Sequence, residues 1–352
     1  MNLKERLHSH LIQIVRDRNP YLASQGHFYA QQYIREQLAQ WGTVEIDDFS
    51  VRGRIHHNLI LDLPPLSPPL AKGGKQEESP IAKGGKQEES PIAKGGKQEE
   101  SPIAKGGKQE ESPIAKGGKQ EESPFAKGGK QDNLGIEKRI KKRLPPIVIG
   151  AHYDSVPGSP GADDNATGVA VLLELARDIA SAPLKYPVQL VAFDMEEYGY
   201  LGSSHHAAKY KQRQESIRLM ISLEMLGYCN HNPNSQSYPA GLKYFYPNSG
   251  NFIALIGTLR TVPDLINLSG KIRKSGQPCE WLPVPNRGLI VPDTRRSDHV
   301  PFWDNGYRAI MVTDTANMRN PHYHRGSDRI ETLDLDFLAG VCRGLVEAIR
   351  YI

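Results

Sequence analysis

Cysteine and long apolar stretches are scarce in this chain of 352 residues. The three cysteines, Cys229, Cys279 and Cys342, are far apart and form no C-x-x-C pair, which argues against a disulfide framework and against a thiolate zinc site. No stretch approaches the roughly 18 uninterrupted apolar residues of a membrane-spanning helix. The N-terminal stretch, residues 1–19, is charged throughout and lacks the apolar segment of a secretory signal. We therefore expect a cytoplasmic protein with reduced cysteines and no membrane partner.

A large charge surplus of either sign is also missing. The chain has 44 Lys and Arg residues against 40 Asp and Glu residues, for a formal net charge of +4. Over this length the surplus is too small to favour a nucleic-acid partner. The hydrophobic content of 38% is that of an ordinary globular protein, so a sizeable core can form. Small substrates are the default expectation.

An internal repeat is the most conspicuous feature of the chain. The sequence AKGGKQEESPI begins at Ala71 and recurs with a period of eleven residues until a truncated copy starts at Ala126. Each copy contains a Gly-Gly pair, a Pro and only one large apolar residue, so the segment cannot bury enough apolar surface to offset its ordering entropy. Strand-like sequences flank the repeat. We therefore predict that residues 66–142 form a low-complexity, disordered insertion within one domain that spans residues 1–352.

Outside the repeat, helical and strand-like patterns alternate along the chain. Strands alternating with helices predict an α/β fold with a largely parallel sheet. The apolar spacing predicts helices at residues 3–18, 27–41, 167–181, 205–212, 251–260 and 334–352. Strands are predicted at residues 44–51, 56–64, 143–154, 188–195, 219–226 and 308–315.

Acidic residues and histidines follow several of the predicted strands. In α/β sheets, ligands bind beyond the carboxyl ends of the strands, so these positions are candidates for a site. His152 and Asp154 are two residues apart at the end of one strand and face the same side. The candidates are His152, Asp154, Asp163, Asp164, Asn165, Glu196, Glu197, Glu224, His322 and His324.

Histidines combined with many carboxylates are the ligand types that zinc binds through nitrogen and oxygen, and a surplus of carboxylate suits two ions that share a bridge. Each motif also has a structural alternative. The Asp163–Asp164 pair is typical of a helix cap, the Glu196–Glu197 pair is typical of a surface, and Glu224 fits the solvent face of a strand. Because all of these motifs lie at or after the ends of predicted strands, together they favour a metal site over the separate structural alternatives.

The order GAHYDS, GADDNATG, a Glu-Glu pair after a strand, LEMLG and NPHYH, with SDHVPFW upstream of the last, resembles the co-catalytic zinc aminopeptidases. That superfamily also contains glutaminyl cyclases, glutamate carboxypeptidases and receptor ectodomains without catalytic activity. The resemblance covers residues 1–62 and 144–352. It implies a three-layer, zinc exopeptidase-like α/β fold, in which helices flank both faces of a mixed, largely parallel central sheet.

The resemblance also implies a set of metal ligands. It makes His152 a ligand of one zinc ion, Asp164 the bridge between two ions, and Glu197 and His324 ligands of the second ion. Glu224 is the remaining ligand of the first ion, although many family members have the shorter Asp at this position. This carboxylate also helps to hold the substrate's α-ammonium group in aminopeptidases.

Three further residues receive roles from the resemblance. Glu196 is the general base that takes a proton from the attacking water and passes it to the leaving amine. Asp154 orients the ring of His152. Tyr323 matches a position that donates a hydrogen bond to the developing oxyanion in some relatives. His299, in SDHVPFW, is interpreted as a packing residue rather than a ligand.

The leading hypothesis is an aminopeptidase that contains two zinc ions and acts on peptides with a free N-terminus. Residues 232–252, rich in Tyr, Pro and Asn, are candidates for lining its substrate pocket. The first alternative is a glutaminyl cyclase with one zinc ion, which a metal count distinguishes from the peptidase. The second is a binding domain of the same fold without catalysis, which predicts that ligands are missing from the set.

Overall fold

The computed structural model describes residues 1–66, 144–239 and 241–352, and within these residues eight strands form one sheet. The strand order is β1-β2-β4-β3-β5-β8-β6-β7. The strands are β1 (Val44–Val51), β2 (Arg54–Leu63), β3 (Ile147–His152), β4 (Val188–Phe193), β5 (Leu219–Glu224), β6 (Ile253–Thr258), β7 (Cys279–Val284) and β8 (Ala309–Thr313).

The centre of the sheet is parallel. Strand β3 pairs in parallel with β4 and β5, and β5 pairs in parallel with β8. Antiparallel pairings join β1 to β2, β2 to β4 and β6 to β8, while β6 and β7 are parallel. The sequences IVIGAH, VQLVAF and LMISLE of β3, β4 and β5 are almost wholly apolar, as expected of strands that are covered on both faces. The predicted mixed, largely parallel sheet is confirmed.

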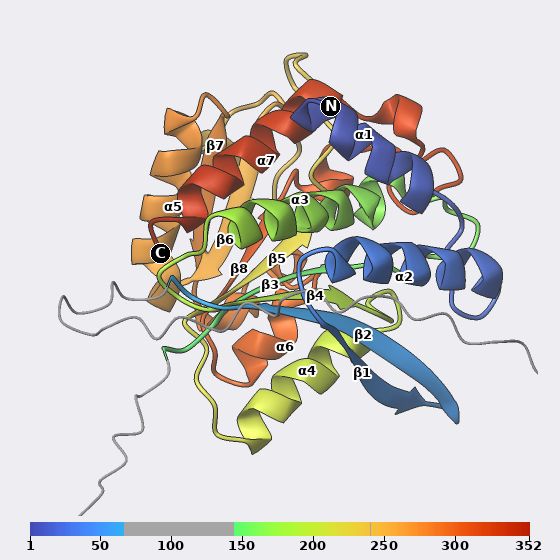
Figure 1. Cartoon of the computed structure of the whole chain (residues 1–352). Helices are drawn as coiled ribbons and strands as arrows, with labels where there is room; N and C mark the ends of the chain where they lie inside the picture. The colour runs from blue at the N-terminus through green and yellow to red at the C-terminus, as the bar shows by residue number, and fades with distance from the viewer. Residues whose placement is uncertain (67–143, 240) are drawn as a thin grey trace, which may run out of the picture. The chain divides into compact units, whose positions relative to one another are not determined.

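Helices cover both faces of the sheet and divide the core in two (Figure 1). On one face, Leu11, Ile34, Val169 and Leu345 belong to a core cluster with Ile149 of β3. The helices of this face are α1 (Leu3–Ile14), α2 (Ser24–Ala39), α3 (Gly168–Ser181), α5 (Val262–Lys274) and α7 (Leu335–Ile349). On the other face, α4 (Leu201–Gln212) and α6 (His299–Asp304) contribute Ala207, Phe302 and Trp303 to a second cluster around Val148 and Val191.

The helix predicted at residues 251–260 is wrong. Its centre is strand β6, where Ile253 and Leu255 face the first core cluster and Ile256 packs against the second. A short apolar run such as FIALIG does not distinguish a buried strand from a buried helix by its periodicity. The pairing with β8 and β7 decides the outcome in favour of a strand.

The predicted insertion at residues 66–142 lies, apart from residue 66, outside the described residues, so its disorder stays a prediction. The described residues on either side, residues 1–66 and 144–352 without residue 240, carry the sheet and both helical layers. Among these residues, the structure contains no helix with the length and apolar character needed to cross a membrane.

Candidate active site

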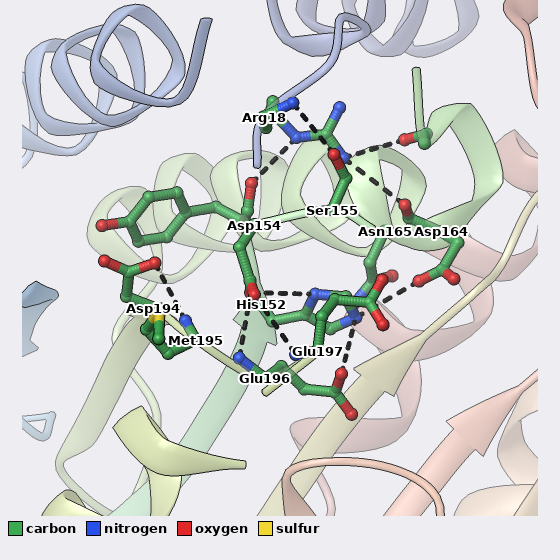
Figure 2. Close-up of polar contacts among 12 residues, drawn as sticks. Arg18, His152, Asp154, Ser155, Asp164, Asn165, Asp194, Met195, Glu196 and Glu197 are labelled. Atoms are coloured by element: carbon green, nitrogen blue, oxygen red, sulfur yellow. Dashed lines mark hydrogen bonds and ion pairs between the residues drawn. The ribbon is translucent and has the colours of Figure 1, made fainter. Parts of the chain in front are cut away.

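Three neighbouring parallel strands bring the predicted site residues to one edge of the sheet. His152 is the last residue of β3, Glu224 is the last residue of β5, and Glu196 is the third residue after the end of β4, followed by Glu197. Because the carboxyl ends of parallel strands meet at the same edge, these residues converge. Figure 2 shows His152, Asp154, Asp164, Glu196 and Glu197 turned toward one another.

The first group of donor atoms surrounds His152. Its Nε2 atom lies 3.4 Å from Asp164 Oδ1 and 3.6 Å from Glu224 Oε2. Glu224 is only 6% exposed, so the alternative in which it faces solvent is excluded. Its extra methylene, compared with Asp, does not remove its carboxylate from the group.

The second group surrounds His324, in the loop before α7. The Nε2 atom of His324 lies 3.2 Å from Asp164 Oδ2 and 3.3 Å from Glu197 Oε2. Asp164 therefore belongs to both groups and presents a different oxygen to each histidine. This is the arrangement that a carboxylate bridging two ions requires.

The spacing and burial of the donor atoms at this edge are those expected of a metal-binding site. Ligands about 2.0–2.2 Å from a tetrahedral zinc ion lie roughly 3.3–3.6 Å apart. The four nitrogen–oxygen distances around the two histidines, 3.4, 3.6, 3.2 and 3.3 Å, are close to this spacing. His152 Nε2 and Glu197 Oε1 are buried and have no hydrogen-bond partner among the described residues. Buried polar atoms without a partner are costly in free energy, and a bound ion would satisfy them.

The pKa values indicate the same surplus of negative charge. Burial raises the pKa of Glu196 well above its ordinary value, and the neighbouring Glu197 and Glu224 raise it further while His152 opposes the shift. Burial also raises the pKa of Glu197 to about 7, helped by the charge of Asp164. A divalent cation at this edge would remove the repulsion between these carboxylates.

Asp154 connects a histidine to the Glu pair. Its Oδ1 atom lies 3.4 Å from His152 Nδ1 and accepts a 3.0 Å hydrogen bond from the backbone N–H of Glu196. Its Oδ2 atom accepts a 3.2 Å bond from the backbone N–H of Glu197. One carboxylate thus fixes both the ring of His152 and the turn that carries Glu196 and Glu197.

Tyr323 lies beside the second donor group, whereas His299 and His322 belong to neither group. The ring of Tyr323 stacks on His324 with 3.8 Å between centroids, and Arg296 Nη2 donates to its hydroxyl at 3.4 Å. His299 is not among the donors: its Nε2 donates to Thr294 O at 2.9 Å, as expected of a packing residue. His322 pairs with Ser327 Oγ instead of joining the site.

The end of the loop that carries Asp164 is held in place by Gly161 and Asn165. Gly161 has a φ of +58°, and a Cβ atom there would lie 2.2 Å from Asp164 O, so glycine is required at this position. The amide of Asn165 donates to Leu223 O at 2.8 Å and accepts from Met225 N at 3.0 Å. Asn165 thereby fixes the loop to both neighbours of Glu224.

Sequence patterns did not reveal three residues that support this loop or the neighbouring Glu224. The guanidinium of buried Arg18 donates to Tyr153 O at 2.8 Å, to Pro160 O at 2.7 Å and to Gly161 O at 2.9 Å. Asp328 accepts hydrogen bonds from the backbone N–H groups of Asp163 and Asp164, and Ser297 Oγ donates to Glu224 Oε2 at 2.7 Å. A charged residue at the end of a helix pattern and single Asp and Ser residues in loops are too common to be recognised in advance.

An apolar pocket opens beside Glu224 and Tyr323. Tyr238, Leu242 and Tyr246 line it, and all three belong to the predicted pocket segment at residues 232–252. The floor includes Trp281 of β7 and Met311 of β8. The pocket therefore joins an apolar surface to the carboxylate edge of the site.

Comparisons with known proteins identify relatives of the chain. The aminopeptidase YwaD of Bacillus subtilis is 40% identical over 226 residues, which cover 62% of this chain and 44% of YwaD. The solved structure of LapA aminopeptidase from Legionella pneumophila matches with a TM-score of 0.60 at 17% identity, over 99% of this chain and 71% of LapA. That of Macrostomum lignano glutaminyl cyclase matches with a TM-score of 0.58 at 16% identity, over 97% of this chain and 88% of the cyclase.

At these identities the two structural likenesses show the fold alone, which aminopeptidases and cyclases share. The chain spans less than two thirds of the length of the curated relatives that it matches. A family model described as Peptidase family M28 matches residues 136–349, a region that contains all eight of the predicted metal-binding and catalytic residues. Since this region is more than half of the 352 residues, and since the family resemblance of the motifs is thereby confirmed, the chain belongs to peptidase family M28.

Proposed function

We propose that the protein is a zinc-dependent aminopeptidase that hydrolyses N-terminal peptide bonds with two zinc ions. The observation that carries the proposal is the position of Asp164, whose two oxygens face His152 and His324 separately. His152, Asp164 and Glu224 would hold one ion, and Asp164, Glu197 and His324 would hold the other. When bound, zinc lowers the pKa of a coordinated water and polarises the substrate carbonyl.

Glu196 has the position of a general base. Its Oε2 atom lies 3.9 Å from His152 Nε2, farther than the oxygens of Asp164 and Glu224. A carboxylate oxygen of Glu196 nevertheless lies within 4.8 Å of donor atoms of His152 and Glu224, close enough to reach a water held there. The Glu196 carboxylate takes the proton of the attacking water and delivers it to the nitrogen of the leaving amine. Asp154 acts as a positioning residue, because it holds the backbone N–H of Glu196 and the ring of His152. Tyr323 would donate a hydrogen bond from its hydroxyl to the developing oxyanion.

The substrate follows from what surrounds the site. The carboxylates at the sheet edge favour the positively charged N-terminus of a peptide over its C-terminus. The adjoining pocket, with Leu242, Tyr246 and Trp281, suits an apolar side chain of the first residue. We therefore propose peptides with a free N-terminus and an apolar first residue as substrates.

The test is digestion of a peptide library, read by mass spectrometry, before and after removal of metal with a chelator. We expect residues to be removed singly from the N-terminus, loss of this activity with chelator, and recovery with zinc. Trimming from the C-terminus, or activity that persists without metal, would contradict the proposal. A peptide with an acetylated N-terminus is the matched control substrate and should stay intact.

The glutaminyl cyclase alternative uses one zinc ion. All five proposed ligands lie in the two donor groups, which supports two ions. Elemental analysis of active enzyme distinguishes the two functions, since one zinc per chain in fully active protein would favour the cyclase. The alternative of a binding domain without catalysis predicts missing ligands, and none of the five is missing.

A further inference from the structure

A second cluster of metal-binding side chains lies outside the active site. Cys229, His231 and Asp334 place one donor atom each within 4.8 Å of the others. The thiol sulfur of Cys229 lies 3.5 Å from His231 Nε2. Ligands at zinc–sulfur and zinc–nitrogen distances of about 2.3 and 2.05 Å in a tetrahedral site lie roughly 3.6 Å apart, so the pair is already spaced for one ion.

The fold explains why these residues meet. Cys229 and His231 lie on the segment that follows β5, and Asp334 is the N-cap residue of α7. The backbone N–H of Asp334 donates to Gly227 O at 2.9 Å, which fastens the two segments together. The sequence argued against a thiolate site because it shows no cysteine pair, and this cluster instead recruits its carboxylate from a distant helix.

Asp334 retains an oxygen for a ligand. Its Oδ1 atom accepts the capping hydrogen bonds from the backbone N–H groups of Asp336 and Phe337, at 3.0 and 2.9 Å. Within the described residues, no hydrogen bond involves its Oδ2 atom. Capping and metal binding can therefore use different oxygens of the same carboxylate.

We propose that Cys229, His231 and Asp334 form a separate zinc site, with water as the fourth ligand. The side-chain nitrogen Nδ2 of Asn251 lies 3.4 Å from His231 Nδ1. A flip of this amide brings its oxygen to Nδ1, where it accepts a hydrogen bond from Nδ1–H and leaves Nε2 free for the metal. The exposed position of His231 and the open fourth position make this zinc exchangeable.

Metal at this site would fasten the end of β5 to the start of α7. The same segment reaches the active-site loop, because the backbone N–H of Gly227 donates to Asp163 Oδ1 at 2.8 Å. Zinc binding at Cys229 is therefore expected to raise the melting temperature beyond the increase due to the active-site ions. This increment should be absent in Cys229→Ser.

Cobalt binding, followed by absorption spectroscopy, tests the proposal. A cysteine ligand gives a thiolate-to-cobalt charge-transfer band. The proposed active-site ligands include no cysteine, so the band would report on the Cys229 site alone. Cobalt is added to full-length protein whose active site is already loaded with zinc. We expect the band to saturate at one cobalt per chain and to be lost in Cys229→Ser. In His231→Asn and Asp334→Asn the affinity should fall at least about tenfold, since even outer partners of metal ligands change affinity by that factor. Asn at position 334 keeps the helix cap, so this variant still folds.

Thiol labelling gives an independent readout. Cys279 and Cys342 are 1% and 0% exposed, so a disulfide reagent reports on Cys229 in the folded protein. Saturating zinc should slow this labelling in the wild type but not in Asp334→Asn. Absence of the cobalt band, an undiminished affinity in both ligand variants, or labelling unaffected by zinc would overturn the proposal. None of these measurements depends on peptide hydrolysis, so the outcome is separate from that of the proposed function.

Discussion

Asp164 directs its two carboxylate oxygens to two different histidines, with Oδ1 3.4 Å from His152 Nε2 and Oδ2 3.2 Å from His324 Nε2. The histidines come from the end of β3 and from the loop before α7, so a single short side chain joins two distant parts of the fold. The neighbouring Asp163 has the same chemical group but faces Gly227 and Asn320 instead. The same substitution at Asp164 and at Asp163 can therefore be compared, with Asp163 as the control.

We expect Asp164→Asn to reduce the zinc content from two ions to one or fewer per chain and to lower kcat/KM by about 100-fold or more, because the amide nitrogen cannot bind a cation. The control is Asp163→Asn. Asp163 accepts hydrogen bonds from Gly227 N–H and Asn320 Nδ2, so loss of its charge should leave the zinc content unchanged. Elemental analysis and steady-state kinetics measure both variants. Equal zinc loss in the two would contradict the bridging role of Asp164.

Substitutions of Glu196 and Glu197 should have different effects, the first on catalysis and the second on metal binding. Glu196→Gln keeps the shape of the side chain but cannot accept a proton, so we expect kcat to fall by about 10²–10⁴-fold with the zinc content unchanged. Glu197→Gln should instead lose zinc, because Glu197 Oε2 belongs to the His324 group. Kinetics and metal analysis on the same preparations distinguish these results. If both variants lost zinc equally, Glu196 would be a ligand rather than the base.

Asp298 should make the metal-free protein less stable as the pH rises. Burial raises its pKa to about 7, above the roughly 3.9 of an unfolded Asp. Protonation therefore favours the folded state, and this contribution is greatest below about pH 4 and disappears as the pH rises through 7. We expect the melting temperature of chelator-treated wild type to fall between pH 5 and about pH 7.5, and to fall less in Asp298→Asn.

Neither carboxylate oxygen of Asp298 has a hydrogen-bond partner among the described residues, so Asp298→Asn removes the charge without breaking a hydrogen bond between them. Bound zinc should flatten the pH dependence of the wild type, since a nearby cation stabilises the ionised carboxylate. An identical pH dependence in wild type and Asp298→Asn would show that another group is responsible.

Much of the site was predictable because its residues interrupt strong apolar patterns. His152 and Glu224 end buried strands, and Glu196 and Glu197 follow another, so their positions relative to the sheet follow from strand prediction. The strand β6 was not predictable, because its identity depends on pairing with β7 and β8 rather than on its own short apolar run. Contacts between distant loops, such as Asp328 with Asp164, leave no local pattern in the sequence.

Arg18 is the most consequential residue that sequence patterns did not reveal. Its guanidinium is fully buried and donates to the backbone carbonyls of Tyr153, Pro160 and Gly161, which lie near the two ends of the loop between His152 and Asp164. Burial lowers the pKa of Arg18 to about 10, although Asp328 and Asp164 oppose the shift, so it stays charged at neutral pH. The guanidinium of Arg18 keeps its positive charge because its planar group donates hydrogen bonds to several carbonyl oxygens at once.

Lysine cannot reproduce this geometry, because its ammonium group is a compact charge at the end of a flexible stem. We expect Arg18→Lys to lower the free energy of unfolding by about 2–4 kcal/mol, since one or two buried carbonyls lose their donor. Urea denaturation measures this loss. Arg35→Lys, at an exposed position on α2, is the matched control and should change stability by no more than about 0.5 kcal/mol. Zinc affinity should fall in Arg18→Lys as well, because His152 and Asp164 must be held by the same loop to share an ion. Unchanged affinity in a destabilised variant would mean that the ligands keep their positions without Arg18.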